Sequence, residues 1–191
     1  MKHLTLALGA MLILPACAPT MSAAPAGPLS LKDSGTVNLT QSWTSVPDGL
    51  HNAKGTVLTK DGMSLNRVHI ISVKAGDEMV DVVDKSLEYP VYSEGMSRLE
   101  QINFVTSSLS RMGLANVDTS SVTPATLSGT DGIRFDLNGK YSSGLNFRGK
   151  VGMAETEAGL NMIIFIAPSE YYYGRDVAEV DNMISTISFP S

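Results

Sequence analysis

The fold is decided by residues 123–167, which read TPATLSGTDGIRFDLNGKYSSGLNFRGKVGMAETEAGLNMIIFIA. Four strand-like segments follow one another here, with only turn residues between them. Apolar and polar side chains alternate over residues 133–138, and they do so again over residues 147–154. Successive side chains of a strand point to opposite faces, so this alternation predicts strands with one buried and one wetted face.

The last segment of the stretch, residues 162–166, reads MIIFI and is apolar throughout. This pattern is typical of a strand that is covered on both sides. Turn residues at 130–132, 142–144 and 158–159 separate the segments. The stretch therefore predicts an antiparallel meander. Further strands are predicted at 36–39, 56–59 and 67–73, whereas residues 77–92 are ambiguous.

Two helices are predicted beside this sheet. The first has one apolar stripe at three- and four-residue spacing, formed by Leu99, Ile102, Val105, Leu109 and Met112. Ser97 and Glu100 have the spacing of a capping box at its start. Apolar residues at 177, 180, 184 and 187 predict the second helix. We therefore expect an α+β fold, an antiparallel β-sheet with helices packed on it, in a single domain over residues 36–191.

The N-terminus has the pattern of a targeting segment. Lys2 is followed by an apolar run over residues 4–14, which is too short to span a bilayer. The run closes with Leu14-Pro15-Ala16-Cys17, which resembles the lipobox of bacterial lipoproteins. The resemblance implies a signal peptide over residues 1–16 and acylation of Cys17, with palmitate among the chains. The alternative is ordinary secretion with cleavage at Ala16-Cys17-Ala18, although Pro19 would then lie unfavourably close to the cut.

Residues 17–35 are rich in Ala, Pro, Ser and Gly and carry no periodic pattern, so we expect a flexible tether there. Two or three acyl chains on Cys17 would hold the protein durably on a membrane. By resemblance to Gram-negative lipoproteins, Ala18 after the cysteine favours the outer membrane, with the domain facing the periplasm. Cys17 is the single cysteine among the 191 residues, so no intrachain disulfide can form.

Composition narrows the choice of partners. The formal net charge is −5, and charged residues make up 17% of the chain without any basic run. Nucleic acids and anionic lipids attract basic surfaces, so neither is expected as an electrostatic partner.

Histidine chemistry offers little support for catalysis. Once the signal peptide is removed, His51 and His69 are the remaining histidines. A serine nucleophile would need one of them next to a carboxylate. His69 alternates with apolar neighbours in a predicted strand, and we expect it to be exposed on a face or capped. We therefore predict no catalytic residues, no cofactor and no enzymatic activity.

Two other local patterns are interpreted as structural. Asp77, Glu78, Asp81 and Asp84 are clustered but lack the glycine and the alternating oxygen donors of a calcium loop, so no metal site is predicted. Residues 144–150 read GLNFRGK and match most of a phosphate-binding loop. They lie in alternating strand sequence rather than before a helix, so the match is a coincidence.

Aromatic residues are the candidates for contact with a partner. Tyr171, Tyr172 and Tyr173 are adjacent, and three adjacent rings cannot all face inward. At least one ring is therefore expected on the surface, where tyrosine favours contacts with partners. The alternative is that the rings pad the start of the last helix. Trp43 is expected in the core.

Several segments together resemble a group of uncharacterised bacterial lipoproteins: residues 90–92 and 96, the 99–112 helix, and residues 129–135, 163–168, 179–181 and 187. The order of strands, helix, meander and helix is also similar to that of the PsbP-like proteins. This resemblance implies an α+β sandwich. It also implies a role in binding or assembling other proteins, and it carries over no catalytic residue.

Three functions follow as hypotheses. The first is a lipid-anchored, non-enzymatic envelope protein that binds or scaffolds another envelope component. The second is a small-ligand-binding lipoprotein with a cleft between helix and sheet, lined by methionine and tyrosine. The third is an envelope hydrolase, which would need a polar cluster around His51 or His69.

Overall fold

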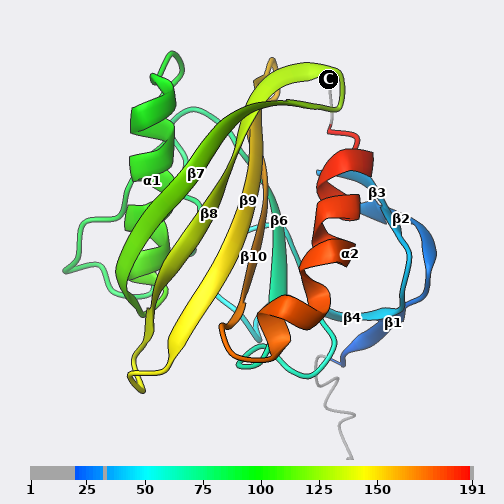
Figure 1. Ribbon diagram of the computed structural model, residues 1–191. Helices are drawn as coiled ribbons and strands as arrows, with labels where there is room; N and C mark the ends of the chain where they lie inside the picture. Colours follow the sequence, from blue (N-terminus) through cyan, green and yellow to red (C-terminus); the bar gives the residue numbers. More distant parts are fainter. Residues whose placement is uncertain (1–19, 32–33, 190–191) are drawn as a thin grey trace, which may run out of the picture.

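The computed structural model describes residues 20–31 and 34–189 of the chain. Eight strands form one antiparallel sheet in the order β1-β4-β5-β6-β10-β9-β8-β7, and β2 and β3 form a separate hairpin. The elements are β1 (Ser22–Ala24), β2 (Gly27–Leu31), β3 (Gly35–Leu39), β4 (Trp43–Val46), β5 (Thr56–Thr59), β6 (Arg67–Val73), α1 (Arg98–Arg111), β7 (Leu114–Leu127), β8 (Thr130–Tyr141), β9 (Asn146–Thr156), β10 (Gly159–Pro168) and α2 (Tyr172–Thr186). Figure 1 shows the twisted sheet between the two helices.

The predicted meander forms one half of the sheet, and β8, β9 and β10 pair in sequence order. Strand β10 is buried on both sides. Met162 and Ile164 belong to the core beneath α1, whereas Ile163 and Phe165 belong to the core beneath α2. The prediction of a strand covered on both faces is confirmed.

Strand β7 is longer than the sequence indicated, because it begins at Leu114 rather than near Thr123. It lies at the outer edge of the sheet, and most of its side chains contact solvent. Its register shifts twice against β8, between Ala115 and Asp118 and between Ser120 and Thr123. A strand that is wet on both faces shows no apolar alternation. Bulges of this kind also protect an edge from pairing with other chains.

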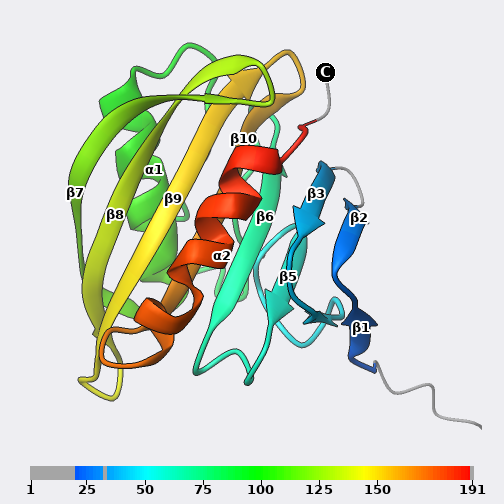
Figure 2. The same cartoon turned by 45° about the vertical axis from the view of Figure 1, so that its right-hand side comes forward.

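The molecule has two cores, one on each face of the sheet. Helix α1 covers one core, and α2 with the β2–β3 hairpin covers the other (Figure 2). The hairpin is fastened to the chain after α2, since the backbone N–H of Thr36 donates to Ser188 at 2.9 Å and that of Ser188 donates to Thr36 at 2.8 Å. The predicted fold class, an antiparallel sheet with helices packed on it, is confirmed.

Helix α1 begins as predicted, with a complete capping box between Ser97 and Glu100. Its buried face differs from the prediction at one turn. Leu99 is 67% exposed, whereas Gln101 is 1% exposed. The Gln101 side-chain amide donates to Glu155 on β9 at 2.7 Å. A hydrogen-bond partner for its polar group is what allows the glutamine side chain into the interface.

The prediction of a flexible tether over residues 17–35 is corrected by the structure. Within this range, β1 pairs with β4 and β2 pairs with β3. Ala24 is 2% exposed and Leu31 is 7% exposed. A single buried apolar residue is therefore enough to hold each of these short strands in place. The folded domain therefore begins before residue 36. Cys17, the predicted lipidation site, lies outside the described residues.

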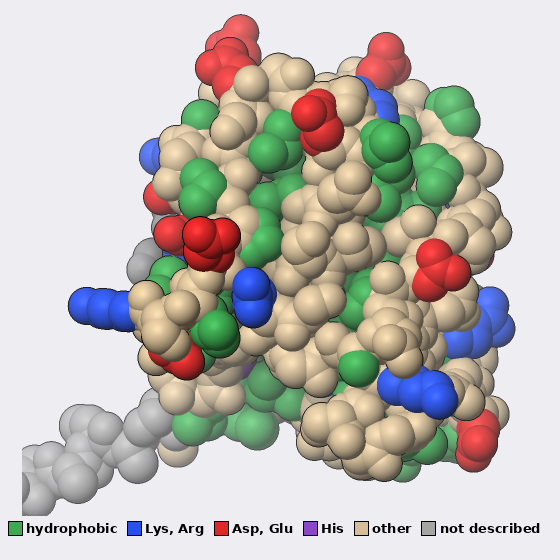
Figure 3. Space-filling view, turned by 90° about the vertical axis from the view of Figure 1, so that its left-hand side faces the viewer, with side chains coloured by type: hydrophobic (Ala, Val, Ile, Leu, Met, Phe, Trp, Pro, Cys, Tyr) green, Lys and Arg blue, Asp and Glu red, His purple; other side chains and the backbone are tan. Residues whose placement is uncertain are grey.

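The segment between β6 and α1 is irregular, held by isolated bridges between Ala53 and Val80 and between Glu78 and Val91. It exposes several apolar side chains, which are Val82, Val83, Leu87 and Val91. Figure 3 looks onto this side of the molecule, where apolar side chains lie between polar ones. In the described part of the chain, no helix is long and apolar enough to cross a membrane.

Candidate partner-binding surface

The three adjacent tyrosines are separated by the start of α2. Tyr173 is 4% exposed, whereas Tyr171 is 62% exposed. The Tyr173 ring stacks on Phe165 of β10 with 5.8 Å between ring centroids. Tyr171 and Tyr172 meet edge to face at 5.2 Å. Tyr173 therefore anchors the helix in the core, and the two tyrosines before it form a paired aromatic surface.

Arg175 lies one turn further along α2 and covers this aromatic pair. Its guanidinium carbon lies 5.6 Å from the ring centroid of Tyr171 and 5.1 Å from that of Tyr172. The same guanidinium donates to Asp176 at 2.7 Å and to Asp61 in the β5–β6 loop. These hydrogen bonds to Asp176 and Asp61 raise the pKa of Arg175 above its ordinary value. Arg175 is therefore a fixed cation whose position is set from two sides.

Asp176 is the centre of a buried polar network. Its carboxylate is 1% exposed and accepts hydrogen bonds from Lys60 at 3.0 Å and from Asn66 at 2.9 Å, in addition to Arg175. Burial alone would raise the pKa of Asp176, but the hydrogen bonds from Arg175, Lys60 and Asn66 outweigh it and lower the pKa. The network joins the start of α2 to the β5–β6 loop.

Further contacts fix α2 and Lys60 of the β5–β6 loop against the chain between β3 and the start of β4. Glu179 is 5% exposed and accepts from the backbone N–H of Thr40 at 2.8 Å. Lys60 lies 4.6 Å from the ring centroid of Trp43 and also donates to Gln41 at 2.8 Å. Trp43 itself is 3% exposed, which confirms its predicted place in the core. Polar groups thus hold α2 along one side while its apolar side packs on the sheet.

We name the exposed part of this arrangement the Tyr–Arg surface, formed by Tyr171, Tyr172 and Arg175. Tyrosine and arginine are the residue types enriched at the centres of protein interfaces. Their side chains lose conformational freedom on binding, and that loss is smaller when packing already holds them. The network below the surface gives it this preorganisation.

His51 and His69 lie elsewhere, and their side chains are buried. His69 is 1% exposed on β6, so of the two predicted positions the exposed one is wrong. Its Nε2 atom accepts a hydrogen bond from Nε of Arg67 at 3.1 Å. Burial lowers the pKa of His69 well below its ordinary value, with further contributions from Arg67 and His51. The His51 side chain is 2% exposed and lies 4.0 Å from the exposed carboxylate of Asp48.

The remaining candidates from the sequence occupy structural positions. The acidic residues Asp77, Asp81 and Asp84 face solvent, with Glu78 partly covered. Among the described residues, no group of histidine, cysteine and acidic side chains could hold a metal ion. Residues 144–150 form the β8–β9 turn and the start of β9, not the strand-to-helix junction that phosphate binding requires.

Several of the methionines, which were predicted to line a cleft, are packed inside the protein. Met153 and Met162 are fully buried in the core beneath α1, and Met183 is fully buried in the core beneath α2. Their flexible side chains fill irregular space between helices and sheet.

Sequence reasoning missed the Asp176 network, although one signal was present. Tyr173, Asp176 and Val180 recur at the spacing of a buried helix stripe, with an acidic residue in the middle. An acid on an apolar stripe needs buried donors. The spacing does not show that Lys60 and Asn66 supply them, because both come from a distant loop.

Comparisons with known proteins place the fold. The solution structure of cyanobacterial PsbP (CyanoP) from Synechocystis sp. PCC 6803 matches with a TM-score of 0.50 and 9% identity, over 96% of this chain and 99% of that chain. The crystal structure of LpqN, involved in cell envelope biogenesis of Mycobacterium tuberculosis, matches with a TM-score of 0.34 and 10% identity, over 92% of this chain and 88% of that chain. No family model and no curated protein matches the chain. The likeness to PsbP shows the fold, which is the PsbP-like α+β arrangement predicted from the sequence.

Proposed function

We propose that this chain is a lipid-anchored, non-enzymatic protein of the cell envelope that binds or scaffolds another envelope protein through the Tyr–Arg surface. The observation that carries the proposal is the position of Tyr171. It is 62% exposed, yet it packs against Tyr172 and lies below the fixed guanidinium of Arg175. A large exposed ring held in one place provides apolar contact area at a low entropic cost.

The placement of the histidines supports a role without catalysis. A general base must reach the proton that it removes from a substrate. The His69 side chain is enclosed in the sheet, and its Nε2 atom already accepts from Arg67. The His51 side chain is 2% exposed, and its Asp48 neighbour points into solvent with 89% of its side chain exposed.

The anchor is proposed from Leu14-Pro15-Ala16-Cys17, and the fold sets its reach. Strand β1 begins at Ser22, five residues after Cys17. Five extended residues span at most about 18 Å, because a residue advances the chain by no more than about 3.6 Å. We propose that the domain is held close to the lipid surface, on the periplasmic side of the outer membrane.

The anchor is tested with the Cys17→Ala variant expressed in a Gram-negative host. The thiol is the acylation site, so we expect the variant to lose the acyl mass and to move from the membrane fraction to the soluble periplasmic fraction. Intact-mass spectrometry and fractionation measure both effects. The proposed lipid anchor would be contradicted if the variant fractionated like the wild type and the wild-type mass included no acyl chains.

The surface is tested separately with Tyr171→Ala, since Tyr171 is exposed and its removal leaves the core intact. Leu99→Ala is the matched control, because Leu99 is similarly exposed, at 67%, on α1 across the sheet. An interface centre contributes about 2 kcal/mol or more per side chain. We therefore expect Tyr171→Ala to reduce recovery of the crosslinked partner from intact cells by at least about tenfold. Equal recovery with both variants would refute the assignment of this surface.

A further inference from the structure

The chain between β6 and α1 exposes a group of apolar side chains. Val83 is 70% exposed, and three others are between 41% and 45% exposed, namely Val82, Leu87 and Val91. Single exposed apolar residues are normal on a protein surface, whereas a group of them gathered in one short loop is typical of an interaction site. We name this group the apolar loop, formed by Val82, Val83, Leu87 and Val91.

The apolar loop is held in one shape. Val80, just before it, is fully buried. The backbone N–H of Asp81 donates to the carbonyl oxygen of Asn52 at 2.7 Å. Within the loop, the Asp84 carboxylate accepts from the backbone N–H of Ser86 at 2.9 Å and from its hydroxyl at 2.7 Å. Because these contacts already order the loop, binding a partner would cost it little conformational entropy.

The apolar loop lies on the α1 side of the molecule. Tyr89, between Leu87 and Val91, lies next to Arg111 at the end of α1, with 6.0 Å between the guanidinium carbon and the ring centroid. The Tyr–Arg surface lies at the start of α2, on the opposite face of the sheet (Figure 1). An inference about the apolar loop therefore does not depend on the function proposed for the Tyr–Arg surface.

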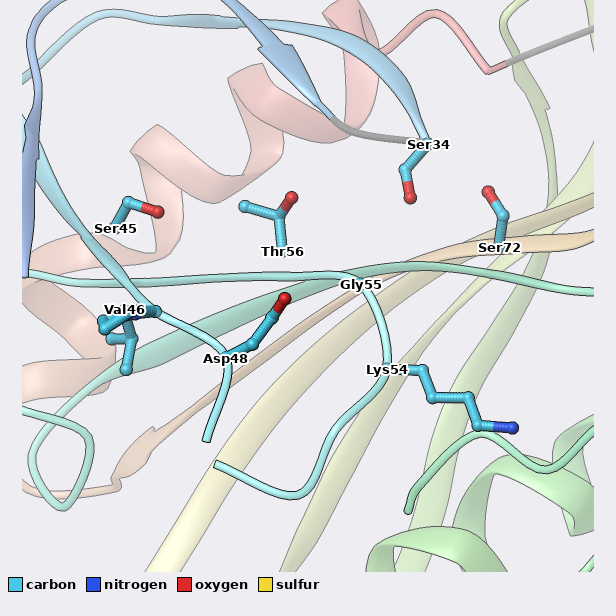
Figure 4. A pocket seen from close by; sticks show the side chains of 9 residues that line it. Ser34, Ser45, Val46, Asp48, Lys54, Gly55, Thr56 and Ser72 are labelled. Atoms are coloured by element: carbon cyan, nitrogen blue, oxygen red, sulfur yellow. The ribbon is translucent and has the colours of Figure 1, made fainter. Parts of the chain in front are cut away.

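Acidic side chains surround the apolar loop. Residues 77–94 contain six acidic side chains and one basic side chain, Lys85. Glu78 is bound to Lys54 at 3.3 Å, and Figure 4 shows the Lys54 side chain turned away from Asp48. The other acidic residues are exposed, and they are Asp77, Asp81, Asp84, Glu88 and Glu94. These carboxylates are therefore accessible to a partner.

The sign of this charge narrows the choice of occupant. Lys74, Lys85 and Arg111 offset part of the negative charge, but an acidic excess remains. Anionic lipids and nucleic acids attract basic surfaces and are repelled by an acidic one. A second copy of the chain would bring like charges together around its own apolar loop, which disfavours association. The occupant that fits is a protein segment of opposite charge.

We propose that the apolar loop docks a basic segment of a partner protein, in which lysine or arginine side chains flank apolar ones. The apolar side chains of that segment pack on Val83 and Leu87, and burial of this surface supplies most of the affinity. The flanking cations pair with Asp81 and Glu88. Such exposed pairs add little affinity, but they select a basic segment over an acidic one.

The test is a titration of the full ¹⁵N-labelled chain, in nonionic detergent micelles, with the synthetic peptide Lys-Arg-Leu-Val-Arg-Lys, followed by amide NMR shifts. We expect saturable shifts at Val82, Val83 and Leu87. The Val83→Ser/Leu87→Ser double variant removes the apolar contact area, and its affinity for the peptide is expected to fall by at least about tenfold. Asp81→Asn/Glu88→Gln keeps the apolar side chains and is expected to bind about threefold more weakly than the wild type.

Val122→Ser/Leu145→Ser is the matched control. Its two side chains are exposed to a similar degree, 49% and 42%, but they lie on β7 and in the β8–β9 turn. We expect this variant to bind the peptide like the wild type. Unchanged amide shifts in the two cores establish that each variant is folded.

The proposal is overturned if the peptide gives no saturable shifts, or if Val83→Ser/Leu87→Ser binds as tightly as the control. It is also overturned if the acidic peptide Glu-Asp-Leu-Val-Asp-Glu binds as tightly as the basic one. Broadening of the Val83 amide by a spin-labelled fatty acid in the micelles would mean that the loop enters the lipid phase instead. Shifts of the same amides on dilution of the protein alone would assign the loop to a second copy of the chain.

Discussion

Asp176→Ala is expected to lower the free energy of unfolding by about 3–5 kcal/mol. The carboxylate is 1% exposed and accepts hydrogen bonds from Lys60, Asn66 and Arg175. Its removal leaves the Lys60 ammonium, with 15% of its side chain exposed, without its ion-pair partner. The Asn66 amide also loses an acceptor in the interior. Uncompensated buried donors and charge are costly because water cannot reach them.

Asp181→Ala on the same helix is the matched control. Its carboxylate pairs with Lys150 at 3.3 Å and with Arg134 at 4.0 Å, but 41% of its side chain is exposed. Exposed pairs of this kind contribute at most about 1 kcal/mol. Urea unfolding followed by circular dichroism measures both variants. Similar losses in the two variants would show that the Asp176 network does not hold α2 in place.

The same network also determines the arrangement of the Tyr–Arg surface. Arg175 is positioned by Asp176 and Asp61, so Asp176→Ala should free its guanidinium from one of two partners. We expect Tyr171 to remain exposed and Tyr172 to remain half-buried, but both rings to lose the fixed cation above them. The stability of the fold and the partner binding that we propose would thus both depend on one buried carboxylate.

The parts of this fold that could be predicted are those in which burial leaves a regular pattern of apolar residues along the chain. Alternation marked β8 and β9, and the continuous apolar run marked β10. Strand β7 escaped the prediction because both of its faces are wet. Strands β1 and β2 escaped because pairing to β4 and β3, rather than a pattern of their own, holds them in place. The sequence of a segment does not show which distant strand will pair with it.

The candidate sites show the same limit. Three adjacent tyrosines cannot all be buried, because successive side chains point in different directions. Tyr171 is indeed exposed and Tyr173 is buried. The stacking of Arg175 on the rings requires the start of α2, which the spacing of apolar residues put further along the chain.

Acid is expected to destabilise this protein through His69. Nε of Arg67 donates to Nε2 of His69, which leaves the ring proton of the neutral imidazole on Nδ1. Protonation would place a second N–H against the Arg67 guanidinium inside the sheet. Burial first, and then the charges of Arg67 and His51, lower the pKa of His69 well below its ordinary value of 6.5. The folded state therefore resists a proton that the unfolded state accepts.

The sign of the effect follows from proton binding. Below pH 6.5 the unfolded chain carries a proton on residue 69 that the folded chain lacks, so stability falls as the pH falls. The slope for one such group is at most about 1.4 kcal/mol per pH unit. His69→Gln keeps an acceptor for Arg67 but does not titrate, and His51 is unchanged in both chains. Urea unfolding between pH 7.5 and 5, about the range in which histidine titrates, measures both chains. We expect the free energy of unfolding to fall more steeply with pH for the wild type than for His69→Gln. Parallel profiles would mean that His69 is not the group that the folded state keeps neutral.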